Sequence, residues 1–155
     1  MVSISADVTI AAAKREDLPE IFALLEECDL PKEGLATHIS TTLVARKGTE
    51  IVGCSALELY QESALLRSVG VKPSYRSRGL GRRLTIAALN LGMQHKISNV
   101  YLLTETANVF FSKLGFEPIS RADVPENVQR SVEFTTLCPD TAMVMTKVLL
   151  GALIL

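Results

Sequence analysis

Apolar residues recur along the chain with two periods, and these predict both strands and helices. Alternation and short apolar runs predict strands at Val8 to Ala12, Thr42 to Arg46, Glu50 to Tyr60, Leu65 to Val71, Asn99 to Thr104 and Ala142 to Leu149. Helical spacing predicts an amphipathic helix that begins near Arg15, a long helix from about Gly79 to Lys96, and a short one from Ala107 to Leu114. We therefore expect an α/β (α+β) fold with a mixed, mainly antiparallel twisted sheet flanked by helices.

The chain shows no internal boundary. Lys47-Gly48 separates two strand patterns and predicts a hairpin, and Gly115 ends the last predicted helix. No repeat, low-complexity run or flexible linker divides the sequence. The prediction is a single domain over residues 1–155.

Composition narrows the class of protein. The net charge is −1 and 48% of the residues are hydrophobic, so nothing in the bulk numbers favours nucleic acid or an anionic membrane as partner. A nucleic-acid site would interleave aromatics with its arginines, but only Tyr75 is aromatic between Arg67 and Arg83. The apolar run Val148 to Leu155 is too short to span a bilayer. We expect a soluble, cytoplasmic protein that binds neither nucleic acid nor membrane.

The cysteines and histidines do not form a recognisable metal or disulfide pattern. Cys28, Cys54 and Cys138 lie far apart, and His38 and His95 are isolated from them. Free thiols and no metal site are expected.

The distribution of charge along the chain is uneven. From Ser63 to Thr104 there is no Asp or Glu, where an even spread of the 17 acidic residues would place about 4 to 5. Four arginines surround the start of the Gly79 helix, namely Arg76, Arg78, Arg82 and Arg83. Cations at a helix N-terminus are unfavourable unless an anion lies among them. Gly79 and Gly81 also leave backbone N–H groups accessible, so the segment predicts a pyrophosphate-binding loop. A tight turn with solvated arginines is the structural alternative.

This segment resembles the GCN5-related N-acetyltransferase (GNAT) superfamily. The resemblance rests on R-x-x-G-x-G at Arg76 to Gly81 after a Val-x-Val strand, then a long helix, a strand, and a short helix that ends in Leu114-Gly115-Phe116. It implies a GNAT fold, with acetyl-CoA as co-substrate. Its implied cofactor-binding residues are Val69, Gly70, Val71, Arg76, Ser77, Arg78, Gly79, Leu80, Gly81, Arg82, Thr104 and Phe111.

Gly70 is unusual within an apolar strand, where glycine is destabilising and often marks a bulge or a close backbone approach. In the family, the backbone of Val69 to Val71 would pair with the pantetheine arm. A free N–H near Val69 or Gly70 would stabilise the thioester oxyanion.

The second half of the chain resembles two narrower branches, the acetyltransferases encoded with arsenic-resistance genes and the acetyltransferase domain of N-acetylglutamate synthases. The shared segments are Tyr101 to Thr104, Phe110-Phe111, Leu114 to Phe116 and Asp123 to Pro125, and the segment Glu133 to Pro139 is closer to the arsenic branch. Both imply a glutamate-like acceptor amine. The candidate substrate-binding residues are Arg67, Ser68, Phe134 and Cys138. Arg67 could bind a carboxylate, or instead be an exposed strand residue or the ion-pair partner of Glu58.

Catalysis would be direct attack of a neutral amine, which requires a proton acceptor. Glu58 is the first candidate, with a surface carboxylate as the alternative, and Glu105 and Glu133 are weaker candidates. The family's usual tyrosine acid is replaced by Phe111, so Ser112, Tyr101 or Cys138 would have to assist the leaving thiolate, or it leaves unaided. A sensor that binds acyl-CoA without turnover and a homodimer are both compatible with the sequence.

Overall fold

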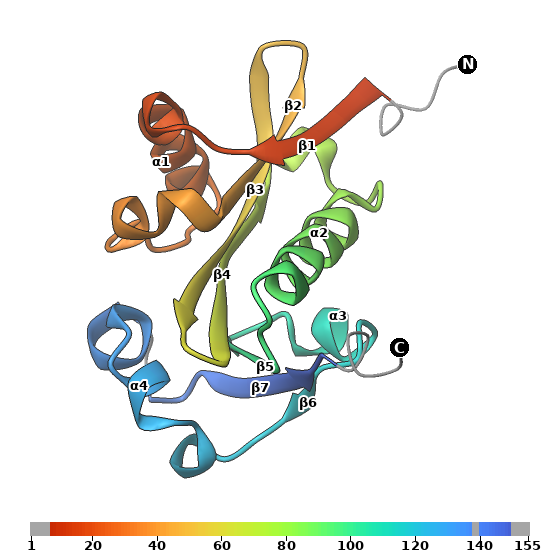
Figure 1. The fold of residues 1–155 in the computed structure, drawn as a ribbon. Coiled ribbons are helices and arrows are strands. Elements are labelled where there is room, and N and C mark those ends of the chain that lie inside the picture. The colour runs from red at the N-terminus through yellow and green to blue at the C-terminus, as the bar shows by residue number, and fades with distance from the viewer. Residues whose placement is uncertain (1–6, 138–139, 150–155) are drawn as a thin grey trace. The chain divides into compact units, whose positions relative to one another are not determined.

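Seven strands form one mixed sheet in the computed structural model, which describes residues 7–137 and 140–149 (Figure 1). The strand order is β1-β2-β3-β4-β5-β7-β6. The strands are β1 Val8–Ala12, β2 Thr42–Lys47, β3 Glu50–Tyr60, β4 Ser63–Val71, β5 Asn99–Thr104, β6 Glu117–Pro118 and β7 Met143–Val148. The predicted fold class, a mixed and mainly antiparallel sheet flanked by helices, is confirmed.

The chain groups into two compact units, which are described in turn. The first contains the residues up to Leu57 together with 68–88, and the second contains 58–67 and the residues from Leu89 onward. Strands β3 and β4 and helix α2 (Leu80–Gln94) each contribute to both units. The expected single domain stays a prediction.

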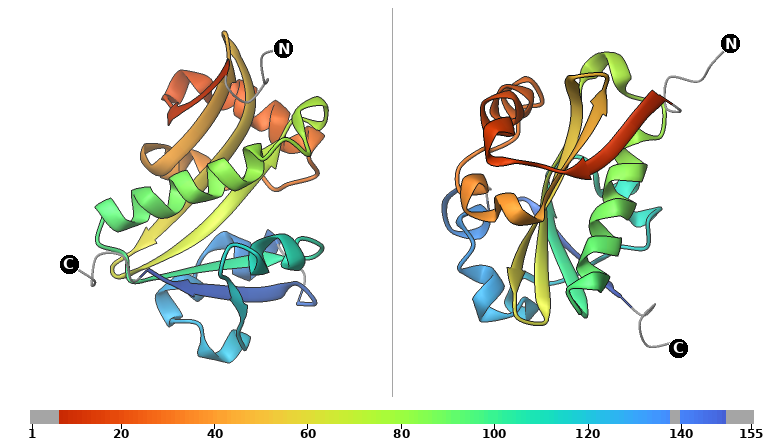
Figure 2. Two further views of the ribbon diagram at one scale, coloured as in Figure 1. Left: turned by 90° about the vertical axis from the view of Figure 1, so that its right-hand side faces the viewer. Right: turned by 45° about the horizontal axis from the view of Figure 1, so that its top comes forward.

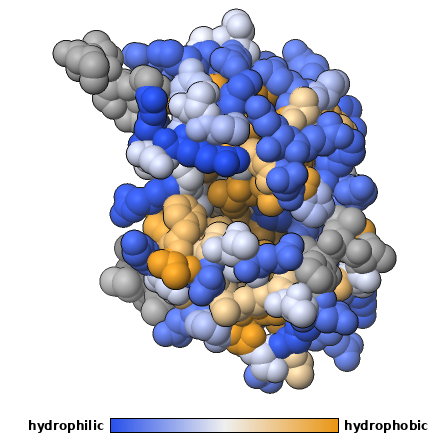
Figure 3. Space-filling model, turned by 180° about the vertical axis from the view of Figure 1, so that it is seen from behind, coloured by the Kyte–Doolittle hydropathy of each residue, from blue (hydrophilic) through white to orange (hydrophobic). Residues whose placement is uncertain are grey.

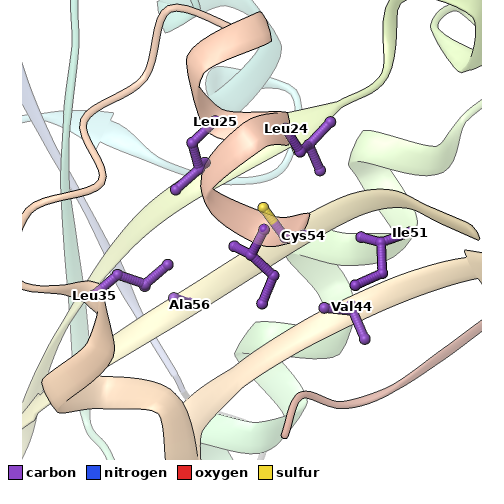
Figure 4. Close-up of a cluster of buried hydrophobic side chains, with 8 residues drawn as sticks. Leu24, Leu25, Leu35, Val44, Ile51, Cys54 and Ala56 are labelled. Carbon is purple, nitrogen blue, oxygen red and sulfur yellow. The ribbon is translucent and has the colours of Figure 1, made fainter. Parts of the chain in front are cut away.

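In the first unit, helix α1 (Leu18–Glu27) packs on strands β2 and β3. Its apolar stripe buries Leu24 and Leu25, which face Val44 and Cys54 from the strands (Figure 4). Burial of each such side chain contributes about 1.5–3 kcal/mol. The helical spacing of apolar residues in this segment thus places them on the one face of α1 that packs into this core.

The start of helix α2 packs into a second cluster of the same unit. Leu80 and Leu84 are buried against residues of β1, β2 and β3, including Val52. A Cβ on Gly53 would lie 2.8 Å from Leu84 Cδ1, so the glycine permits this close approach. This packing fixes the N-terminus of α2 relative to the three strands.

In the second unit, the start of β4 pairs in parallel with β5, and β7 pairs antiparallel with both β5 and β6 (Figure 2). The core includes Leu65, Tyr101 and Val144, covered by Val124 and Val128. Val124 directly follows the 3₁₀ turn at Arg121–Asp123, and Val128 lies in the short helix α4 (Glu126–Gln129). This core therefore holds the short elements that follow β6 against the strands.

Several short elements were not expected from the sequence. They are the 3₁₀ turns η3 Leu35–Thr41, η4 Pro73–Tyr75 and η5 Arg121–Asp123, strand β6, helix α4 Glu126–Gln129, and the π-helix η6 Glu133–Leu137. They are too short to show a period. The short predicted helix is confirmed as α3 Asn108–Ser112.

The surface carries few large apolar side chains. Among the described residues, the exposed ones are Val109, Phe110, Met143 and Val148, and the face in Figure 3 is largely hydrophilic with limited apolar areas. None of the helices in this part of the chain is long and apolar enough to cross a membrane.

We expect Asp17→Asn to lower the free energy of unfolding by about 1 kcal/mol. Asp17 accepts a hydrogen bond from the Lys14 N–H and pairs with Arg46, and the Lys14 bond is the main cause that lowers its pKa below 3.8. Because the folded pKa is lowered, this stabilisation is present above the unfolded pKa and is lost as the pH falls through the folded value. Urea unfolding of both proteins at neutral and acidic pH should show the difference shrink below about pH 4. A difference that is constant with pH would contradict this role.

Candidate active site

The loop before α2 has the backbone geometry of an anion-binding site. Ser77 and Gly79 both adopt left-handed conformations, with φ of 65° and 80°, immediately before α2 begins at Leu80. The first N–H groups of a helix have no partner within the helix, and alternation of this kind turns successive N–H groups toward one point. A Cβ on Gly79 would meet no atom within 4 Å, so its glycine is required by the dihedral angle rather than by crowding.

The arginines of this loop have different surroundings. The Arg76 Nε donates to the Val71 carbonyl at 2.9 Å and its Nη2 lies 3.4 Å from the Cys28 Sγ. The Arg83 Nη2 donates to the Val8 carbonyl. Arg78 and Arg82 are exposed. Arg76 therefore holds the loop against the end of β4, while Arg78 and Arg82 leave their guanidinium groups exposed beside the start of α2.

Strand β4 has a left-handed residue in its interior, and it is Ser68 rather than Gly70. Ser68 has a φ of 60° and is 7% exposed, and its carbonyl accepts from the Cys54 thiol at 3.2 Å. A left-handed non-glycine residue inside a strand is strained and typical of functional sites. Gly70 is explained differently, because a Cβ there would lie 3.3 Å from both Cys28 Sγ and Leu30 Cδ1. Val69 and Val71 are half-buried.

In the second unit, Arg67 lies in a buried ionic cluster with two carboxylates. Its Nη1 is 2.9 Å from Glu58 Oε2 and its Nε is 3.3 Å from Glu133 Oε2. The side chains of Arg67 and Glu58 are 0% and 1% exposed, and that of Glu133 is 8% exposed. Two of the alternatives left open by the sequence are excluded here, since Glu58 is not a surface carboxylate and Arg67 is not an exposed strand residue. The ion pair between them, one of the alternatives from sequence, is present.

Tyr60 and Ser131 close this cluster into a ring of hydrogen bonds. The Tyr60 hydroxyl donates to Glu58 Oε1 at 2.5 Å and accepts from the Ser131 hydroxyl. Ser131 Oγ in turn accepts the Glu133 backbone N–H at 3.2 Å. We call these five residues (Glu58, Tyr60, Arg67, Ser131 and Glu133) the buried ring. It connects the end of β3 and the middle of β4 to the π-helical turn.

The other predicted residues of the second unit differ in exposure. Phe111 is 7% exposed and packs edge-to-face on Phe116, with ring centroids 5.7 Å apart. Phe134 is half-buried, and the Arg121 Cζ lies over its ring, 5.6 Å from the ring centroid. The Thr104 hydroxyl accepts the Ala107 N–H at the start of α3. Cys138 lies outside the described residues.

Of the groups considered as substitutes for a tyrosine acid, two are described. Tyr101 is 7% exposed, and burial is the main cause that raises its pKa. Ser112 is exposed at the end of α3. Glu105, a weaker candidate for the proton acceptor, is exposed.

The comparison with protein families agrees with this fold and loop. Residues 38–118, about half of the chain, match the model of the acetyltransferase (GNAT) domain. The chain therefore belongs to the GNAT acetyltransferase family, a class of N-acetyltransferases that depend on acetyl-CoA.

Relatives of the chain include enzymes named for amino-acid acetylation. It is 28% identical over 118 residues to an uncharacterised N-acetyltransferase of Chlorobaculum tepidum, covering 74% of this chain and 76% of that protein. It is 28% identical over 134 residues to an amino-acid acetyltransferase of Neisseria meningitidis, covering 81% of this chain but 31% of that protein. The fold resembles that of N-acetylglutamate synthase of Neisseria gonorrhoeae, whose structure was solved in complex with coenzyme A and N-acetyl-glutamate. The TM-score is 0.79 and the sequence identity is 24%, and the match covers 92% of this chain and 35% of that one. The chain thus spans about a third of the length of the two Neisseria proteins.

Sequence reasoning missed Tyr60 and Ser131 as parts of the site. A signal for Tyr60 was available, because residues two apart in a strand point to the same face and Glu58 had already been selected. Ser131 had no such signal, since it lies far along the chain in an irregular stretch.

We expect Tyr60→Phe to remove a phenol that ionises only near pH 12. Burial and the hydrogen bond to Glu58 raise the pKa of Tyr60 to about 12 from 10.0. Because the folded pKa is raised, the stabilisation is present below pH 10 and is lost as the pH rises through the folded value. Ultraviolet titration should show the last phenolate step disappear in the variant, and unfolding should depend less on pH above 10. Retention of that step would contradict the hydrogen bond to Glu58.

Proposed function

We propose that the chain transfers an acetyl group from acetyl-CoA to the amine of a small acidic amino acid, or of a glutamate-like phosphinic or arsinic analogue, by direct attack. The observation that carries the transferase part is the loop Arg76 to Gly81, with its two left-handed residues at the start of α2, in a GNAT chain. The choice of an acidic acceptor is supported by the names of the relatives and by a guanidinium buried on β4.

The residues present fit the charge of coenzyme A. Arg78 and Arg82 supply positive charge beside backbone N–H groups that no helical carbonyl uses. From Ser63 to Thr104 no acidic side chain opposes a bound pyrophosphate. The bound thioester supplies an activated acetyl group, and the chain has to hold it and receive the amine's proton.

For the reacting end, we propose roles for β4 and β3. We propose that the left-handed backbone at Ser68 leaves the N–H group of Val69 or Gly70 available to stabilise an oxyanion. Glu58 is the proposed proton acceptor, directly or through water. Arg67 and Tyr60 orient its carboxylate, since each donates to a different oxygen.

One observation favours a second candidate function. Phe111 stands where many family members have the tyrosine acid, and its buried ring packs on Phe116 and has no proton to donate. A protein with an intact cofactor loop but no efficient proton donor would act as an acyl-CoA sensor.

A thiol-release assay with acetyl-CoA tests the proposal. The acceptors are glutamate, aspartate, glutamine, the phosphinic and arsinic analogues of glutamate, and a polyamine. Turnover with an acidic acceptor and not with the polyamine is expected. Calorimetric binding of acetyl-CoA with no turnover on any acceptor would favour the sensor, and preference for the polyamine would refute the acidic substrate class.

A further inference from the structure

We propose that Glu133 occupies the position on Arg67 that the acid group of the acceptor takes, so that binding exchanges one carboxylate for the other. This inference rests on the proposed function and specifies how its acidic substrate is recognised. It makes Glu133 a determinant of substrate affinity within the buried ring.

The burial of Arg67 requires such an exchange. Its side chain has no exposed surface, so an incoming carboxylate can reach the guanidinium only if a present neighbour moves. Glu58 contacts the Nη1 of Arg67 and Glu133 contacts its Nε. An incoming carboxylate that binds either of these nitrogen atoms would replace the carboxylate already there.

The geometry indicates that Glu133 is the one that moves. Glu58 lies in β3, accepts from both Arg67 and Tyr60, and is 1% exposed. Glu133 lies in a π-helical turn outside the sheet, at a longer distance of 3.3 Å and with 8% of its side chain exposed. π-helical turns are rare and are frequent at functional sites.

The turn that carries Glu133 has supports that do not depend on its carboxylate. The N–H groups of Phe134 and Thr135 donate to the Ser131 carbonyl, and the Glu133 N–H donates to Ser131 Oγ. These bonds can persist while the Glu133 side chain rotates toward solvent. The exchange also conserves the net charge of the buried ring, because one carboxylate leaves Arg67 as another arrives. A guanidinium can bind the carboxylate of the acceptor with two parallel hydrogen bonds.

The test is Glu133→Gln, which keeps the size of the side chain and removes its charge. The KM for glutamate should fall about three- to tenfold, because the side chain at position 133 then binds Arg67 more weakly and competes less with the substrate. The change in kcat should be smaller. As inhibitors, glutarate should bind tighter by a similar factor, whereas glutaramide, which has no charge, should change less than about twofold. Glu117→Gln is the matched control, since it removes an exposed carboxylate of the same unit and should change neither inhibitor.

The inference is overturned if glutarate and glutaramide respond alike to Glu133→Gln, or if glutarate binds more weakly. If Glu133→Gln folds poorly, Glu133→Asp is the second variant, since it withdraws the carboxylate from Arg67 by one methylene. It should change the KM for glutamate and the affinity for glutarate in the same directions as Glu133→Gln, but by less. Failure of the proposed function looks different. In that case the unsubstituted chain turns over no acidic acceptor, and calorimetry with glutarate still measures whether Glu133 competes for Arg67.

Discussion

Arg67→Ala is expected to lower the free energy of unfolding by about 3–5 kcal/mol. The substitution leaves Glu58 and Glu133 buried without the guanidinium that both contact. Removing one partner of a buried ion pair costs far more than the pair contributes, because the remaining charge has been taken out of water. Such a loss is a large fraction of the 5–15 kcal/mol that stabilises a typical domain.

Chemical denaturation measures this effect. Arg78→Ala is the matched control, because it removes an exposed arginine and should shift stability by no more than about 0.5 kcal/mol. If Arg67→Ala cost as little as Arg78→Ala, the burial and pairing of Arg67 would be wrong.

The same position has a kinetic consequence if Arg67 binds the acceptor. Arg67→Lys keeps a positive charge but not the planar fork, so it should preserve more of the fold while raising the KM for an acidic acceptor well above any change for acetyl-CoA. Steady-state kinetics with each substrate varied in turn gives both constants. Equal changes in both would assign Arg67 a structural role.

Gly81→Asp is expected to weaken acetyl-CoA binding by at least about a hundredfold. A carboxylate in the first turn of α2 would lie where the pyrophosphate is proposed to bind. Two like charges about 4 Å apart near a protein surface repel each other by several kcal/mol before salt screens them. The fold should not suffer, because aspartate near a helix N-terminus is favourable by about 0.3–1 kcal/mol.

Calorimetric titration with acetyl-CoA, together with thermal unfolding, separates these two effects. Gly81→Asn has nearly the same size without the charge, so it should bind acetyl-CoA more tightly than Gly81→Asp. Unchanged affinity in Gly81→Asp would refute the role of this loop.

The periodic parts of the chain were predictable and the irregular parts were not. The apolar stripe of α1 and the strands before Lys72 follow from the spacing of apolar residues, and the loop at Arg76 follows from a local motif. The strain at Ser68 could not be predicted, because a left-handed serine is imposed by its surroundings rather than by its own preference. Gly70 is predicted from the sequence to mark a bulge or a close backbone approach, but in the structure its lack of a side chain makes room for Cys28 and Leu30.

The buried ring shows a second limit of sequence reasoning. Arg67, Glu58 and Glu133 had each been selected as candidates with separate roles. Their assembly depends on a contact across 66 positions of the chain, between β4 and a π-helical turn without periodic pattern. No local rule predicts such a contact.

If the arginines at the start of α2 bind acetyl-CoA as proposed, the stability of the folded protein should depend on the supply of that ligand. Arginines at that end of a helix are unfavourable in the ligand-free protein, and an anion bound among them removes the penalty. By mass action, a ligand at a hundred times its Kd adds about 2.7 kcal/mol to the stability of the folded state. A cell short of that ligand would therefore hold more of the protein in the form that proteases degrade, and its abundance would follow the level of the metabolite it uses.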